Sequence, residues 1–131
     1  MGKPEVRYLI DSNVWIEAAA NVPCAVKALK CAMQGRWVGY SAITRLELFS
    51  YPDLNAREER QLKELLGLFI EVDVTAEIID KAITIRRSKR VRIPDALIAA
   101  SALQTSSALI TRNVDDFKKI VGLNMINPEM M

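Results

Sequence analysis

Short apolar runs alternate along this chain with longer segments in which apolar residues recur every three or four positions. The short runs predict strands at residues 6–10, 37–41, 69–72, 108–111 and 125–126. The longer segments predict helices over residues 14–20, 23–34, 43–49, 57–68, 75–85 and 94–103. Apolar strands that alternate with helices are typical of a parallel sheet covered on both faces. We therefore expect one α/β domain over residues 1–131, with three α/β/α layers around a parallel sheet of four to five strands.

Two of the predicted helices differ in how their apolar residues are distributed. Residues 94–103 are small and apolar nearly all round, which predicts a helix buried on most sides. In the helix over residues 75–85, Ile78, Ile79, Ala82, Ile83 and Ile85 are the predicted apolar side.

The composition indicates a globular protein that remains in solution. Half of the 131 residues are hydrophobic and 26% are charged. No stretch approaches the roughly 20 apolar residues that span a bilayer. We expect a cytoplasmic protein that does not bind a membrane.

The chain contains no histidine. This absence excludes catalysis by Ser-His-Asp or Cys-His groups and excludes metal sites built on histidine. Cys24 and Cys31 stand seven residues apart on a predicted helix, a separation of about 10 Å, so we expect reduced thiols. The five glycines form no phosphate-binding loop, which argues against a nucleotide cofactor and against a nucleotide-processing enzyme. Any catalysis must use carboxylates, hydroxyls, cations or a hard metal ion.

Four acidic residues fall where parallel strands are expected to end. Asp11 directly follows the first strand, and Glu47 lies on the helix after the second. Asp95 begins the helix that leads into the fourth strand, and Asp116 lies just beyond that strand. Ligands of open α/β sheets bind at this edge. Carboxylates brought together there repel one another unless a divalent cation such as Mg²⁺ or Mn²⁺ joins them.

Each of these acids also has a purely structural interpretation. Asp11 and Asp95 are suited to cap the helices that follow them, and Asp115 or Asp116 to cap a short helix at Phe117. Glu47 can face solvent from its helix. With 16 acidic residues in the chain, spacing alone does not select the four.

The segments around these acids resemble the PIN domain family, and within it the VapC-type toxins of toxin–antitoxin pairs. The resemblance runs from about residue 6 to residue 128 and is carried by residues 8–14 (YLIDSNV), 43–48 (ITRLEL), 93–100 (IPDALIAA), 109–117 (LITRNVDDF) and 127–128 (NP). The first four of these motifs in this order are specific, although each alone is weak.

The resemblance implies a metal-dependent endoribonuclease. Asp11, Glu47, Asp95 and Asp116 would be the catalytic residues and would hold one or two Mg²⁺ or Mn²⁺ ions. Ser12, Thr111 and Asn113 would support them by hydrogen bonding. Hydrolysis by a water molecule would leave 5′-phosphate and 3′-hydroxyl ends on the RNA. The resemblance also implies a homodimer inhibited by a cognate antitoxin protein.

One position departs from the family pattern. Many PIN domains carry an aspartate where this chain has Asn113, so Asp116 would act without it, with Asp115 as a weaker substitute. The principal alternative to the nuclease is a non-catalytic PIN-like module that binds RNA or a partner protein, although clustered acids would not help such a module to bind RNA.

Basic residues are concentrated before Asp95. Residues 86–92 contain five cations, whereas the rest of the chain carries a net charge of −3. We interpret Arg86 and Arg87 as RNA-binding residues and the remainder of the run as a solvated helix end. Four cations elsewhere are further candidates for RNA contact: Arg45, Arg112, Lys118 and Lys119. Trp15 and Trp37 could stack on bases, but core packing or a subunit contact is the better interpretation.

Overall fold

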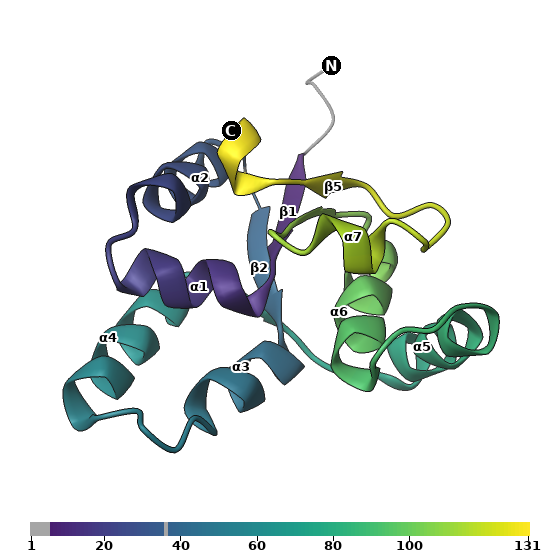
Figure 1. Cartoon of the computed structure of the whole chain (residues 1–131), viewed down its shortest axis with the longest axis horizontal. Helices are drawn as coiled ribbons and strands as arrows, with labels where there is room; N and C mark the ends of the chain where they lie inside the picture. Colours follow the sequence, from purple (N-terminus) through teal and green to yellow (C-terminus); the bar gives the residue numbers. More distant parts are fainter. Residues whose placement is uncertain (1–5, 36) are drawn as a thin grey trace.

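The computed structural model describes residues 6–35 and 37–131, and these residues form a five-stranded sheet surrounded by helices (Figure 1). The strands are β1 (Arg7–Ile10), β2 (Trp37–Ser41), β3 (Ile70–Val72), β4 (Ala108–Ile110) and β5 (Met125–Ile126). The α-helices are α1 (Ser12–Ala19), α2 (Pro23–Met33), α3 (Ala42–Phe49), α4 (Ala56–Leu66), α5 (Ala76–Ser88), α6 (Ile93–Gln104) and α7 (Val114–Phe117). A 3-10 helix, η1, covers Pro128–Met130.

Every pair of neighbouring strands is parallel, in the order β3-β2-β1-β4-β5. The predicted α/β fold with a parallel sheet is therefore confirmed, and the short fifth strand is part of it. β1 lies at the centre, where Leu9 pairs with Gly39 on one side and with Leu109 on the other. The order makes β1 and β4 neighbours although about 100 residues separate them.

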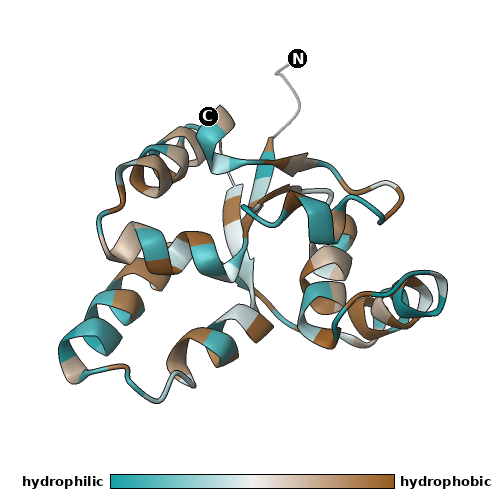
Figure 2. Ribbon diagram, in the orientation of Figure 1, coloured by the Kyte–Doolittle hydropathy of each residue, from teal (hydrophilic) through white to brown (hydrophobic). Residues whose placement is uncertain are grey.

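Side chains alternate between the two faces of the sheet and form two cores. Leu9 and Leu109 pack with the apolar sides of α5 and α6. Ile10 and Ile110 point the other way and pack with α1, α2 and α4. Figure 1 accordingly shows α5, α6 and α7 on one side of the strands and α1, α2 and α4 on the other. In Figure 2 the outermost helices, α4 and α5, carry many hydrophilic residues, as expected of layers that face water.

Helix α6 has more buried residues than any other described helix. Seven of its residues, from Asp95 to Ala102, are buried, which confirms the prediction from its apolar sequence. On α5, by contrast, Ile78, Ala82 and Ile85 are buried while Ile79 and Ile83 are each 45% exposed. The predicted apolar side of α5 is therefore wider than the face that the core covers.

Several predicted boundaries shift for local reasons. Helix α1 begins at Ser12 rather than Val14, because Asp11 caps it directly. Phe69 lies outside β3 and packs against the ring of Trp15, with ring centroids 5.1 Å apart. Cys24 and Cys31 are free thiols, as predicted. Within the described residues no helix combines the length and apolarity needed to span a membrane.

Candidate active site

The four predicted acids lie on four separate segments at the carboxyl edge of the sheet. Asp11 follows β1, and Glu47 lies on α3, which begins directly after β2. Asp95 is the third residue of α6, and Asp116 lies in α7, shortly after β4. Figure 1 shows α1 and α3 leaving the sheet at the ends of neighbouring strands β1 and β2. Parallel strands therefore carry these segments to one edge.

Asp11 is a buried carboxylate, with only 4% of its surface exposed. Its Oδ1 accepts a hydrogen bond from the Ser12 backbone N–H at 2.8 Å, and its Oδ2 accepts one from Thr111 Oγ1 at 2.8 Å. Its own backbone N–H donates to the Ile110 carbonyl at 3.0 Å. Asp11 therefore caps α1, as the structural interpretation predicts, and the bond from Thr111 fixes its second carboxylate oxygen at the candidate site.

Burial raises the pKa of Asp11 above its ordinary value of 3.8. The hydrogen bonds from Thr111 and from the Ser12 backbone oppose this rise, because they stabilise the ionised form. The negative charges of Asp95 and Glu47 add to it. These three carboxylates therefore lie within electrostatic reach of one another.

Glu47 is connected to the Asp11 segment through Ser12. Ser12 Oγ donates to Glu47 Oε1 at 2.9 Å and lies 3.1 Å from Thr44 Oγ1. Thr44 is fully buried, one helical turn before Glu47. Sequence reasoning missed Thr44, and the available signal was its i, i+3 spacing to Glu47 on the same helix face.

Asp95 is 7% exposed and lies in the first turn of α6, where the helix dipole favours a negative charge. It makes no cap: the residue at the cap position is Arg92, and no side chain bonds the end of this helix. The capping interpretation of Asp95 is therefore wrong. Arg92 Nε instead donates to Asp95 Oδ2 at 3.2 Å.

Arg92 is the second residue that sequence reasoning missed. Its pKa is raised, first by the hydrogen bond to Asp95 and then by the charges of Asp95, Glu47 and Asp116. The Arg92 guanidinium therefore contacts Asp95 and lies within electrostatic reach of Glu47 and Asp116. The sequence pattern places Arg92 in a solvated helix end and does not predict its bond to Asp95.

The residues after β4 surround the exposed part of the site. The Asn113 backbone N–H donates to Thr111 Oγ1 at 3.0 Å, so Thr111 contacts Asp11 and Asn113 together. Asp115 and Asp116 lie inside α7 rather than before it, and the idea that either caps this helix is wrong. Asp115 is 91% exposed and pairs with Lys118 at 3.1 Å, away from the coupled acids.

The predicted RNA-binding cations differ in whether a carboxylate of the protein neutralises their charge. Arg45 is paired with Glu71, and Arg112 is paired with both Glu17 and Glu129. Their charges are balanced within the protein, which leaves less attraction for RNA. Arg86 Nε donates to the Val91 carbonyl at 3.0 Å, and Arg87 is exposed without a bonded partner in the described part of the chain.

The two tryptophans are buried to different extents. Trp15 is fully buried, donates from Nε1 to the Ile10 carbonyl at 3.0 Å and packs edge-on against Tyr40. Trp37 is half-buried beneath the guanidinium of Arg7, 5.6 Å from the ring centroid. Core packing therefore accounts for Trp15.

The acids match a hard divalent cation in their chemistry. All four offer carboxylate oxygens, the donor that Mg²⁺ and Mn²⁺ prefer. Within residues 6–35 and 37–131, no three acidic, cysteine or histidine side chains converge closely enough to ligate one ion jointly. Mg²⁺ commonly takes one or two protein carboxylates and completes its shell with water, so the donor set fits such an ion.

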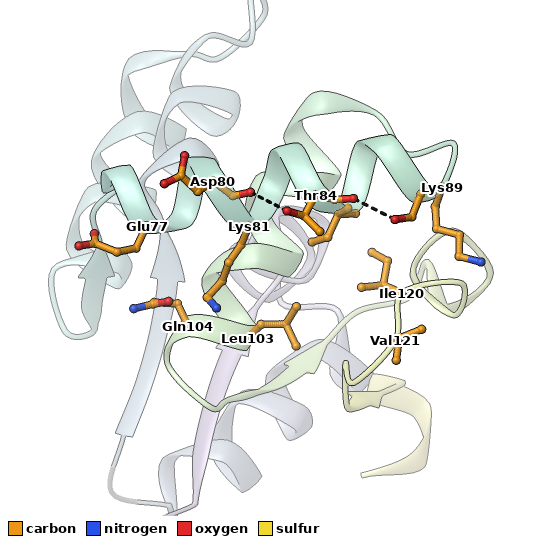
Figure 3. Close-up of a pocket in the computed structure, with 11 residues that line it drawn as sticks. Glu77, Asp80, Lys81, Thr84, Lys89, Leu103, Gln104, Ile120 and Val121 are labelled. Carbon is orange, nitrogen blue, oxygen red and sulfur yellow. Dashed lines mark hydrogen bonds between the residues drawn. The ribbon is translucent and has the colours of Figure 1, made fainter.

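A separate hollow of about 600 Å³ lies on the far part of α6 (Figure 3). It is bounded by α5, by Leu103 and Gln104 at the end of α6, and by Ile120 and Val121. Glu77, Asp80, Lys81 and Lys89 bring both signs of charge to its rim. None of the four predicted acids lines it, so this hollow is distinct from the candidate site.

Comparison with known proteins identifies relatives of the same fold. A protein from Shigella flexneri, the tRNA(fMet)-specific endonuclease VapC, is 25% identical over 128 residues, which is 90% of this chain and 95% of that protein. A toxin–antitoxin complex from Klebsiella pneumoniae contains a chain that is 26% identical, with a TM-score of 0.79 over 95% of this chain and 99% of that one. VapBC2 from Rickettsia felis, bound to a promoter DNA fragment, has a TM-score of 0.82 at 21% identity, over 93% of this chain and 98% of the other.

The family described as PIN domain matches residues 8–123. This range covers most of the chain and includes all of β1 except Arg7, β2 to β4, and all four acids at the sheet edge. The sequence match and the shared topology agree with the resemblance seen in the motifs. The chain therefore belongs to the PIN domain family.

Proposed function

We propose that this protein is a VapC-like endoribonuclease toxin that hydrolyses RNA phosphodiester bonds with Mg²⁺ or Mn²⁺, the whole chain acting as a single domain. One observation carries the proposal: Asp11, Glu47 and Asp95, from three separate segments, lie within electrostatic reach of one another at one sheet edge, where Ser12 bonds Glu47 and Arg92 bonds Asp95. Carboxylates gathered in this way repel one another, and a divalent cation would offset that repulsion more fully than the single guanidinium of Arg92 does. The endonuclease activity of the Shigella flexneri relative supports the same conclusion.

In this proposal Asp11 and Asp95 are the principal metal ligands, because both are buried and held in place by hydrogen bonds. Glu47 binds metal or orients water, and Asp116 completes the acidic ring from its exposed position. The bound ion would supply charge to activate a water molecule and to stabilise the phosphoryl group.

The supporting residues fix these acids so that little reorganisation is needed during the reaction. Thr111 and the Ser12 backbone hold the two oxygens of Asp11, and the Ser12 hydroxyl holds Glu47. Asn113 is positioned through its own bond to Thr111. Preorganised groups of this kind lower the barrier because their orientation is already set.

We further propose two protein partners, a cognate antitoxin and a second copy of this chain. The Klebsiella pneumoniae and Rickettsia felis relatives were both solved as toxin–antitoxin assemblies, which supports the first partner. Sedimentation of the purified protein, alone and with the product of a neighbouring small reading frame, tests both partners.

The activity is tested by incubating antitoxin-free protein with total RNA in Mg²⁺, in Mn²⁺ and in EDTA. We expect discrete metal-dependent fragments with 5′-phosphate ends, absent in Asp95→Asn. Asp80→Asn is the matched control, because Asp80 is exposed on α5 and lies outside the acidic site. Intact RNA under every condition, from folded protein, would favour the non-catalytic binding module.

A further inference from the structure

A small basic hollow adjoins the acidic site. It has a volume of about 360 Å³ and is lined by Arg86, Lys89, Arg90, Val91 and Arg92, at the junction between α5 and α6. We call these residues the basic pocket. Four of the five carry a positive charge.

Local bonding folds this junction into a pocket. Helix α5 ends at Ser88, and Arg86 Nε reaches forward to donate to the Val91 carbonyl at 3.0 Å. Val91 is buried in the core beside α6, so the turn is anchored from both ends. Lys89 and Arg90 also line this hollow, and Lys89 lies between it and the larger hollow beside α5, which it lines as well.

Among the described residues, three of the four cations of the basic pocket have no counter-ion: Arg86, whose side chain bonds only a backbone carbonyl, Lys89 and Arg90. Within residues 6–35 and 37–131, neither Lys89 nor Arg90 forms an ion pair or a side-chain hydrogen bond. Arg45 and Arg112, by contrast, are neutralised by carboxylates. Apart from Arg87, which lines a different hollow, the unpaired cations of the basic run therefore line this pocket.

Arg92 connects the pocket to the acids. It lines the hollow and also donates to Asp95 Oδ2, within reach of the charges of Glu47 and Asp116. A ligand held by Lys89 and Arg90 would therefore lie beside the carboxylates, with Arg92 between them.

An anionic substrate faces an electrostatic difficulty at this site, because clustered carboxylates repel phosphate. A neighbouring cationic pocket offsets that repulsion and steers the strand toward the acids. We propose that the basic pocket binds a backbone phosphate of the RNA substrate, adjacent to the bond that is cut. This inference rests on the proposed ribonuclease function and adds a phosphate subsite to it.

Phosphate fits the pocket better than an acidic protein segment does. Guanidinium groups pair with phosphate oxygens through directed hydrogen bonds, and the pocket contains two arginines besides Arg86. Val91 is the single apolar residue among its lining residues, so an amphipathic peptide would find little apolar surface there.

The test is binding of a fluorescein-labelled single-stranded RNA, followed by anisotropy in EDTA across a salt series. The double variant Lys89→Gln/Arg90→Gln should bind more weakly for every RNA sequence. Its plot of log K against log salt should be shallower by about 0.7, the value for one lost phosphate contact on a single strand. In Mg²⁺ its kcat/KM for cleavage should fall in parallel.

Two controls separate local charge from net charge and folding. Lys27→Gln/Lys30→Gln removes the same charge from α2, which packs against α1, β2 and η1, and should keep the wild-type slope. Lys89→Arg/Arg90→Lys preserves both charges and should restore binding. Unchanged thermal stability is expected in all three variants, because these side chains are exposed.

The outcomes distinguish this subsite from the proposed function. If the wild type cuts RNA and Lys89→Gln/Arg90→Gln binds RNA with the wild-type slope, the subsite is refuted while the ribonuclease stands. If the double variant binds RNA with the wild-type slope but loses affinity for polyglutamate, the pocket binds an acidic protein segment instead. A wild type that neither binds nor cuts RNA would overturn both proposals.

Discussion

Replacing Thr111 with valine would remove one hydroxyl from the centre of the acidic site while preserving side-chain shape. Thr111 is fully buried, and its Oγ1 donates to Asp11 Oδ2 at 2.8 Å while accepting from the Asn113 N–H at 3.0 Å. A hydrogen bond to a charged acceptor contributes about 1.5–3 kcal/mol, and a neutral one about 1 kcal/mol. Asn113 is half-buried, so water can replace part of its bond.

We expect Thr111→Val to lower the free energy of unfolding by about 2–3 kcal/mol, because the Asp11 carboxylate stays buried without its donor. Unfolding entropy near 2.1 cal/mol/K per residue gives about 0.28 kcal/mol/K for this chain, so Tm should fall by about 9 °C. Urea and thermal unfolding in EDTA measure both quantities. Thr84→Val is the matched control, because its hydroxyl bonds the Asp80 carbonyl on an exposed surface, and it should change stability by less than about 0.5 kcal/mol.

A double-mutant cycle isolates the charged hydrogen bond. In an Asp11→Asn background the acceptor is neutral, so Thr111→Val should cost about 1 kcal/mol less than in the wild type. Equal costs in the two backgrounds, or a wild-type cost below about 0.5 kcal/mol, would refute the role assigned to this bond.

Three further predictions follow from the same contacts. In EDTA, raising the pH from 3.8 through the raised pKa of Asp11 should lower the free energy of unfolding of the wild type relative to Asp11→Asn, because Asp11 ionises at a higher pH in the folded state than in the unfolded state. A difference between the two proteins in urea denaturation that does not change with pH would contradict this. Arg92→Gln should bind Mn²⁺ more tightly in calorimetry, since a cation within electrostatic reach of three carboxylates is lost. Its free energy of unfolding should change by at most about 1 kcal/mol, because the Arg92 side chain is largely exposed. An unchanged Kd for Mn²⁺ would count against the charge coupling. Trp15→Phe should lower the free energy of unfolding by about 2–3 kcal/mol through a cavity and the lost bond to the Ile10 carbonyl, and a loss below about 0.5 kcal/mol in urea would exclude a core role.

The elements and their layering follow from sequence pattern. The starts predicted for α4 and α5, residues 57 and 75, each lie one residue from the observed starts, where Asn55 and Thr75 cap the helices, because capping depends on groups two or three residues apart. The near-uniform apolarity of residues 94–103 likewise predicts the buried helix α6. The pattern overstated the buried side of α5, where Ile79 and Ile83 stay exposed, since periodicity alone does not give the width of the covering surface.

The candidate site is only partly predictable from sequence. The strand ends make Asp11, Glu47, Asp95 and Asp116 candidates, but only the resemblance to PIN domains selects them from 16 acidic residues and implies a common role. The pattern did not assign Arg92 to the acids or Thr44 to the hydroxyl contacts. Both lie one helical turn from a predicted acid, but whether such a neighbour faces the site or solvent depends on the rotation of its helix.

By itself, the sequence determined which segments form helices and strands, where several helices begin, and that histidine takes no part in any chemistry of this chain. These properties depend on residue types and on contacts within a few positions. The tertiary structure alone decided which distant groups meet. The order β2-β1-β4 brings Thr111 to Asp11 across 100 positions, and Ser12 reaches Glu47 across 35. It also decided which cations remain available, because Glu71 and Glu17 neutralise Arg45 and Arg112 while Lys89 and Arg90 stay unpaired within the described residues. Hydrogen bonds and ion pairs act over a few ångströms of space, and that proximity is set by strand order rather than by sequence separation.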